Sequence, residues 1–81
     1  MKVRVLFYAQ LRDLLGMRQL DVDVADGATV RDLLAQIYAQ RPELRPHDNS
    51  ILIGAGVEFV DRNYRLFPGE EISIMPPVQG G

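Results

Sequence analysis

One stripe of apolar residues in the middle of the chain does most to limit what this sequence can fold into. The stripe repeats at the three- and four-residue spacing of one helix face, and it comprises Val30, Leu33, Leu34, Ile37 and Tyr38. Thr29 can cap the start of this helix, with Asp32 in the place of the acidic partner of a capping box. Pro42 cannot continue it, so we expect an end near residue 41. A single helix cannot bury such a face alone, so the remaining chain must supply a second layer.

Strand patterns occupy much of the remaining sequence. Alternating or short apolar runs occur at residues 2–8, 19–25, 51–55, 57–60 and 71–75. Between the first two runs, residues 9–15 predict a short helix that ends at Gly16. Residues 42–50 contain two prolines and predict a loop. Glu70-Glu71, where the last strand run begins, predicts a polar turn.

The alternation assigns side chains to the two faces of the sheet. In the first strand, the side chains expected to face the core are Val3, Val5 and Phe7. The side chains expected on the outer face are Arg4, Leu6 and Tyr8. Strands on both sides of one main helix give an α+β pattern.

We therefore predict a β-grasp fold, in which a mixed sheet has one main helix packed across one face. In this fold the first and last strands are usually parallel neighbours at the centre of the sheet. A chain of 81 residues is long enough for one domain. We place this domain at residues 1–75, followed by a tail at residues 76–81.

Composition argues against several classes of function. The chain has no cysteine, which excludes a thiol nucleophile and a cysteine-rich zinc site and fits a cytoplasmic location. The net charge is −2 and the arginines form no cluster in the sequence, so we expect no nucleic-acid partner. We also expect no membrane span, because no stretch of about 18 apolar residues is present.

Neither the carboxylates nor the one histidine has the spacing of a metal site. Asp21, Asp23 and Asp26 resemble a calcium loop only loosely, because the following glycine comes one place late. His47 lies in the predicted loop, where we expect it to be exposed to solvent. We therefore predict no metal site and no bound cofactor.

The tail at residues 76–81 reads Pro-Pro-Val-Gln-Gly-Gly and has the features of a probe. The prolines favour a stiff, extended chain, whereas Gly80 and Gly81 have no side chains and are pliable. Fully extended, the tail reaches roughly 20 Å from the domain. Its tip can enter a channel that any larger side chain would block, and there it presents the Gly81 carboxylate.

A free carboxylate is a poor electrophile and reacts only after activation, for example as an acyl-adenylate. The activated acyl carbon can then accept sulfur and become a thiocarboxylate. The chain has no cysteine, no Ser-His-Asp arrangement and no phosphate-cradling loop, so it cannot perform this activation itself. If the tail takes part in chemistry, another protein is the catalyst. The alternative is an idle, disordered end.

Both ends of the chain resemble one known family, the small subunit of molybdopterin synthase. Residues 5–16, Val-Leu-Phe-Tyr-Ala-Gln-Leu-Arg-Asp-Leu-Leu-Gly, are similar to the family's opening strand and helix. The more specific likeness is an acidic turn, an apolar strand and Pro-Pro-Val-x-Gly-Gly, all within residues 68–81. The family often has an asparagine before the hairpin at Gly54-Ala55-Gly56. This chain has none, so the likeness does not predict the turn type there.

The resemblance implies a ubiquitin-like fold and a role as a non-catalytic sulfur carrier in molybdenum-cofactor synthesis. An activating enzyme would use ATP to adenylate Gly81, and sulfur transfer would give the thiocarboxylate. The tail would then enter the large synthase subunit, whose catalytic groups deliver the sulfur to a pterin precursor. Two large and two small subunits would form a heterotetramer. By position, the residues that dock both partners would be Tyr8, Phe59 and Met75, continued by Pro76, Pro77, Val78 and Gln79.

Three alternatives stay open at this point. The same tail could carry sulfur for thiamine, transfer RNA or cysteine synthesis. It could instead join Gly81 to lysines of other proteins, as a ubiquitin-like modifier does. Lys2 is the only lysine in this chain, so extended chains of copies through varied lysines are not expected. The third alternative is a plain binding module with an idle tail.

Overall fold

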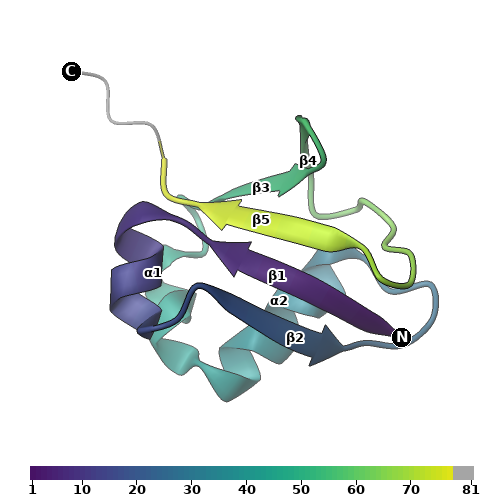
Figure 1. The fold of residues 1–81 in the computed structure, drawn as a ribbon, viewed down its shortest axis with the longest axis horizontal. Coiled ribbons are helices and arrows are strands. Elements are labelled where there is room, and N and C mark those ends of the chain that lie inside the picture. Colours follow the sequence, from purple (N-terminus) through teal and green to yellow (C-terminus); the bar gives the residue numbers. More distant parts are fainter. Residues whose placement is uncertain (78–81) are drawn as a thin grey trace.

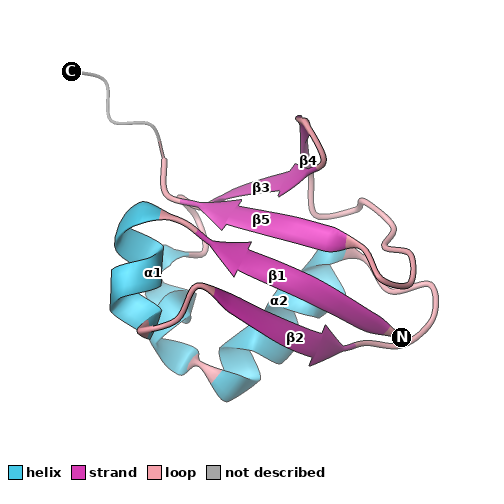
Figure 2. Cartoon of the chain, in the orientation of Figure 1, coloured by secondary structure: helices cyan, strands magenta, loops and turns pink. Residues whose placement is uncertain are grey.

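The computed structural model describes residues 1–77, which form a five-stranded sheet with helices against one face (Figures 1 and 2). In chain order the elements are β1 (Lys2–Phe7), α1 (Ala9–Leu15), β2 (Gln19–Asp23), α2 (Val30–Gln40), the 3-10 helix η1 (Pro42–His47), β3 (Leu52–Ala55), β4 (Glu58–Val60) and β5 (Glu71–Met75). None of the helices in this described part is long and apolar enough to cross a membrane.

The strand order across the sheet is β2-β1-β5-β3-β4. The central pair, β1 and β5, is parallel, with Val5 opposite Ile72, and every other pair is antiparallel. This is the predicted β-grasp arrangement, with the first and last strands side by side. A parallel pair is normally buried on at least one face by a helix, and α2 lies behind the sheet in Figure 1.

The apolar stripe of α2 packs on the inner sheet face, as its spacing predicts. All five stripe residues are buried, and Val3, Val5 and Phe7 of β1 face them from the sheet. Burying one such side chain fully stabilises the fold by about 1.5–3 kcal/mol. The start of α2 has the predicted cap, because the Asp32 carboxylate accepts a hydrogen bond from the Thr29 N–H at 2.9 Å. The Thr29 hydroxyl donates to the same oxygen at 3.2 Å.

The prediction of a plain loop at residues 42–50 is wrong, because residues 42–47 form η1. Pro42 occupies the start of this helix, where its missing N–H costs nothing. Leu44 is fully buried and holds the segment against the core. The Tyr38 hydroxyl donates a hydrogen bond to the Asp48 carboxylate just beyond η1. Burial, and then this hydrogen bond, raise the pKa of Tyr38.

The prediction of a polar turn at Glu70-Glu71 is wrong for Glu70, which is only 7% exposed. Its carboxylate accepts hydrogen bonds from the Tyr64 hydroxyl at 2.6 Å and from the Phe67 N–H at 3.2 Å. The hydrogen bond to Glu70 raises the pKa of Tyr64, because it favours the protonated phenol. Glu70 therefore ties the long connection after β4 to the start of β5.

We expect Glu70→Ala to lower the free energy of unfolding by about 1–3 kcal/mol, because the substitution leaves the Phe67 N–H and the Tyr64 hydroxyl without their acceptor. Glu71→Ala is the matched control, since Glu71 is the adjacent, exposed carboxylate. Its effect should stay within about 0.5 kcal/mol. Urea unfolding followed by circular dichroism measures both variants, and equal losses would show that Glu70 has no special structural role.

Candidate docking face at the root of the tail

Parallel pairing of β1 and β5 places the root of the tail beside Tyr8. β5 ends at Met75, then Pro76 is half-buried and Pro77 is exposed. The Tyr8 N–H donates a hydrogen bond to the Ile74 carbonyl at 3.2 Å. The N-terminus lies at the opposite end of the sheet (Figure 1). The predictions for Val78, Gln79, Gly80 and Gly81 lie outside the described residues.

The strand register places Phe59 on the same face of the sheet. Gly54 lies opposite Phe59 on one side and opposite Ser73 on the other. Met75 lies opposite Leu52, two residues along β3 from Gly54, so it points to the same face. The side chains of Tyr8 and Phe59 are 43% and 69% exposed, and Met75 is partly exposed.

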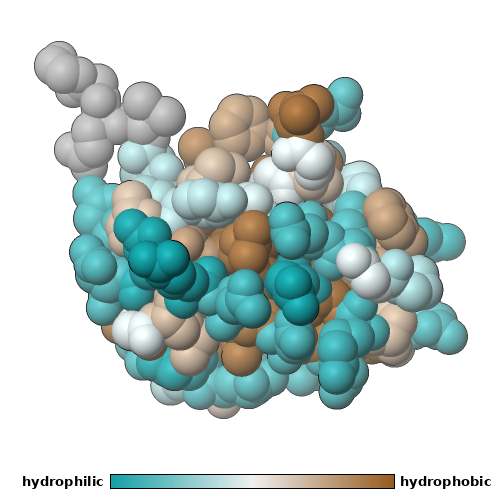
Figure 3. Space-filling view, in the orientation of Figure 1, coloured by the Kyte–Doolittle hydropathy of each residue, from teal (hydrophilic) through white to brown (hydrophobic). Residues whose placement is uncertain are grey.

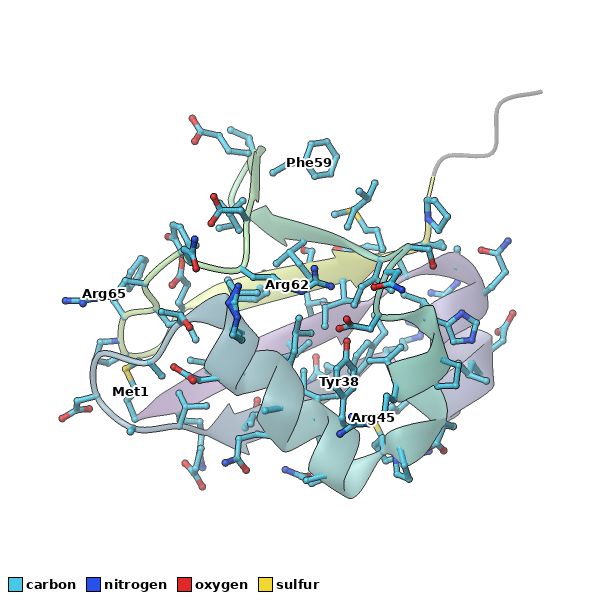
Figure 4. All side chains as sticks on the ribbon, turned by 180° about the vertical axis from the view of Figure 1, so that it is seen from behind. Met1, Tyr38, Arg45, Phe59, Arg62 and Arg65 are labelled. Carbon is cyan, nitrogen blue, oxygen red and sulfur yellow. The ribbon has the colours of Figure 1, made fainter. Side chains whose placement is uncertain are left out.

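These three side chains surround one open hollow of about 340 Å³ on the outer sheet face. It is lined by Tyr8, Gly54, Gly56, Val57, Glu58, Phe59, Ser73 and Met75. We call this set the docking face. Figure 3 shows apolar atoms over the β3–β4 hairpin, near the root of the tail, and Figure 4 shows Phe59 standing clear of the sheet. The face therefore offers exposed apolar contacts next to the start of the tail.

The sequence did not single out Val57 or Gly54 as part of this face. Val57 is fully exposed at the tip of the β3–β4 hairpin. Gly56 has φ of 62°, and Ala9 is the sole non-glycine residue with positive φ among residues 1–77. A two-residue turn with positive φ only at its first position is type II′. The pair Gly56-Val57 between two short strand patterns was the available signal, because it indicates a hairpin turn that would expose Val57.

The backbone beside Tyr8 is strained. Tyr8 is extended, and the next residue, Ala9, has φ of 51° as the chain turns into α1. A left-handed conformation costs a residue with a Cβ about 1–2 kcal/mol. The turn lets Leu11 enter the core while Tyr8 stays on the outer face. The strain thus falls at the edge of the docking face.

A second hollow, of about 410 Å³, lies on the helix side of the tail root. It is lined by Gln10, Leu11, Leu14, His47, Ser50, Ile51, Pro76 and Pro77. Pro76 and Pro77 therefore border a different surface from that of Tyr8, Phe59 and Met75. His47 is exposed, as predicted. No group of three His, Cys, Asp or Glu side chains within residues 1–77 is placed to hold a metal ion.

The fold also gathers three arginines that the sequence spreads apart. Arg31, Arg45 and Arg62 line a hollow beside Tyr38. Figure 4 labels Tyr38, Arg45 and Arg62, which lie on the helix side of the molecule. The Arg62 guanidinium donates to the Asp48 carbonyl and lies 3.3 Å from the Asp48 carboxylate. The Arg45 guanidinium carbon lies 5.6 Å from the centre of the Tyr38 ring. Asp48 offsets part of this positive charge. No local pattern in the sequence predicts the grouping of these arginines.

Comparison with known proteins identifies the family of this chain. The profile of the ThiS family matches residues 5–81. The chain belongs to the ThiS family. This ThiS-family chain is 34% identical to the molybdopterin synthase sulfur carrier subunit of Chlamydomonas reinhardtii, and the alignment covers both chains completely. It is 36% identical to the protein of the same name from Escherichia coli strain K12, over 98% of this chain and 99% of the relative. The resemblance noted in the sequence is confirmed.

Solved structures of similar proteins have the same fold. The crystal structure of SAMP1, small archaeal modifier protein 1, from Haloferax volcanii matches with a TM-score of 0.89 and 27% identity over the whole of both chains. A complex of subunits 1 and 2 of molybdopterin-converting factor from Helicobacter pylori contains a chain that matches with a TM-score of 0.73 and 26% identity, again over both chains completely. The ubiquitin-like β-grasp prediction is confirmed.

Proposed function

We propose that this chain is the sulfur carrier of a molybdopterin synthase and works in the cytoplasm. One observation supports this most: an exposed apolar face lies directly beside the start of a Pro-Pro-Val-Gln-Gly-Gly tail. Two relatives at 34% and 36% identity over nearly full length are molybdopterin synthase sulfur carrier subunits. The face would bind a partner while the tail delivers its terminal group.

The proposed chemistry occurs at the Gly81 carboxylate. One carboxylate oxygen attacks the α-phosphorus of ATP on an activating enzyme, which forms an acyl-adenylate and releases pyrophosphate. Hydrosulfide then attacks the acyl carbon, so that a C–S bond forms and the bond to AMP breaks. The products are the thiocarboxylate, AMP and a proton, and no electrons are gained or lost. When the sulfur passes to a pterin precursor, water supplies the oxygen that restores the carboxylate.

The proposed partner is the large subunit of the synthase. The Helicobacter pylori structure is a complex of two subunits of molybdopterin-converting factor, and one of its chains has this fold. In our proposal the large subunit contacts Tyr8, Phe59 and Met75, while Pro76 to Gly81 enter its active site. The activating enzyme would use the same face, because both partners must reach the same carboxylate. The two partners would therefore bind one after the other.

A reconstitution tests this function. The thiocarboxylated chain is mixed with the purified large subunit and the pterin precursor, and the dithiolene product is measured by its oxidised fluorescent derivative. We expect product to form and the chain to return to its carboxylate mass. If the large subunit binds the chain but sulfur stays on it, the acceptor lies in another pathway. If the two proteins do not bind, the proposal fails.

A modifier role is the second candidate, because the matching SAMP1 structure belongs to a small archaeal modifier protein. Its test uses the distribution of lysine and arginine in this chain. No lysine or arginine follows Arg65, so trypsin would leave residues 66–81 as one branch on a modified lysine. Finding that branch on host proteins by mass spectrometry would establish conjugation. Its absence, alongside a thiocarboxylate on Gly81, would leave sulfur transfer as the function.

A further inference from the structure

Gly54 is an unexpected residue for its position. It is buried in β3, an internal strand with β5 on one side and β4 on the other. Its φ is not positive, so it does not use the conformation that favours glycine. A glycine inside a strand weakens the strand, because it orders a flexible residue and contributes no side chain. The remaining reason for glycine at this position is space.

Met75 occupies that space. A Cβ added to Gly54 would lie 3.1 Å from Cε of Met75, closer than such contacts normally are. It would lie 3.6 Å from Cβ of Ser73 and 3.7 Å from the Glu58 carbonyl oxygen, which are ordinary contacts. Met75 therefore lies across Gly54 with its terminal methyl group against the backbone. All four residues line the hollow of the docking face.

We propose that Gly54 is the positioning residue of the docking face: it seats Met75, and so sets the depth of the hollow that receives one large apolar side chain of the large subunit. This inference rests on the proposed function. Met75 is the last residue of β5, so its packing against Gly54 also fixes the position at which the tail begins. A thioether side chain adapts its shape to a partner, provided that it has room to move.

This role predicts opposite effects on stability and on binding. Gly54→Val introduces a residue that favours strands, and the one close contact is with the flexible end of Met75. We therefore expect the melting temperature to stay the same or rise. The added methyl groups raise Met75 and fill the hollow. We expect the dissociation constant for the large subunit to rise about tenfold or more.

The test measures melting temperature and affinity for the purified large subunit in four variants: Gly54→Val, Gly54→Ala, Met75→Ala and the double variant Gly54→Val, Met75→Ala. Gln19→Val is the matched control, since Gln19 is exposed on the same sheet face but outside the hollow. The control should bind as the wild type does. In the Met75→Ala background, Gly54→Val should cost much less affinity than it does alone. An equal cost in both backgrounds, or unchanged affinity of Gly54→Val, would overturn the proposal.

A measurement without a partner separates this proposal from the proposed function. In the free protein with ¹³C-labelled methionine methyl groups, Gly54→Ala should shift the Met75 resonance and leave those of Met1 and Met17 in place. An unshifted Met75 resonance would show that the Met75 side chain does not pack against Gly54, which would overturn the proposal. If the resonance shifts but the wild-type chain does not bind the large subunit, then Met75 does pack against Gly54 and the proposed function fails. Gly54→Ala serves this purpose even if Gly54→Val does not fold.

Discussion

Deletion of Gly81 should abolish sulfur transfer and leave the folded domain unchanged. The core of residues 1–77 is formed by side chains from Val3 to Ile74, and Gly81 has no side chain that could add to a core. The shortened tail still ends in a carboxylate, but that group falls short by about 3.5 Å. A misplacement of about 1 Å can cost 10²-fold in rate, so we expect no transfer above background. The rate of dithiolene formation and the melting temperature are the two measurements.

The matched control for this deletion is Gln40→Ala, an exposed substitution at the end of α2. It should leave both the rate and the melting temperature at the wild-type values. Extension of the chain by one alanine after Gly81 should be as harmful as the deletion, because the carboxylate then lies too far along. Sulfur transfer by the truncated chain at the wild-type rate would contradict a role for the Gly81 carboxylate.

Phe59→Asp should reduce affinity for the large subunit by about 30-fold or more while changing stability little. Phe59 is 69% exposed, so the fold loses little buried area with the ring. In the complex the new carboxylate would be buried against Tyr8 and Met75 without a partner, and truncated anchors of an interface typically cost 2 kcal/mol or more, about 30-fold. Tyr8→Asp and Met75→Asp should act in the same direction.

Phe67→Asp is the matched control for the docking face. Phe67 is 55% exposed and does not line the hollow, so this variant loses a similar exposed ring and gains the same charge. Isothermal titration with the large subunit should give the wild-type affinity for Phe67→Asp. Equal losses for Phe59→Asp and Phe67→Asp would mean that added charge, and not the docking face, weakens the complex.

Much of the fold can be predicted from periodic patterns. The stripe from Val30 to Tyr38 predicted α2 and its buried face, and the alternation of Val3, Val5 and Phe7 predicted the inner face of β1. These predictions succeed because the spacing of side chains along an element is a local property. The β-grasp class followed from the order of the elements.

The errors share a physical cause, which is contact made by irregular segments that have no repeating pattern of side chains. Leu44 is buried by α1, α2 and the core, so a segment with two prolines becomes η1. Glu70 is buried because Tyr64 and Phe67 fold back onto it from the preceding connection. Neither contact leaves a periodic signal in the sequence.

Some residues of the candidate site could also be predicted from the sequence, whereas others needed the tertiary structure. Alternation placed Tyr8 on the outer face and the resemblance pointed to Phe59 and Met75. The strand register brings all three around one hollow. Gly54 carries no chemical group, so only its contact with Met75 identifies it. Arg31, Arg45 and Arg62 come from α2, from η1 and from the connection after β4, so their grouping needs the tertiary structure.

The central claim is that the Gly81 carboxylate is converted to a thiocarboxylate by another protein. Intact-mass spectrometry tests it directly, on the chain incubated with the activating enzyme of its host, ATP and hydrosulfide. Exchange of one oxygen for sulfur predicts a gain of about 16 Da. After trypsin digestion this gain should be found in the fragment of residues 66–81. It should be absent when ATP is omitted. As a positive control, the same activating enzyme must be shown to adenylate a carrier that it is known to serve. If that control succeeds and the mass of this chain stays unchanged, the account is contradicted.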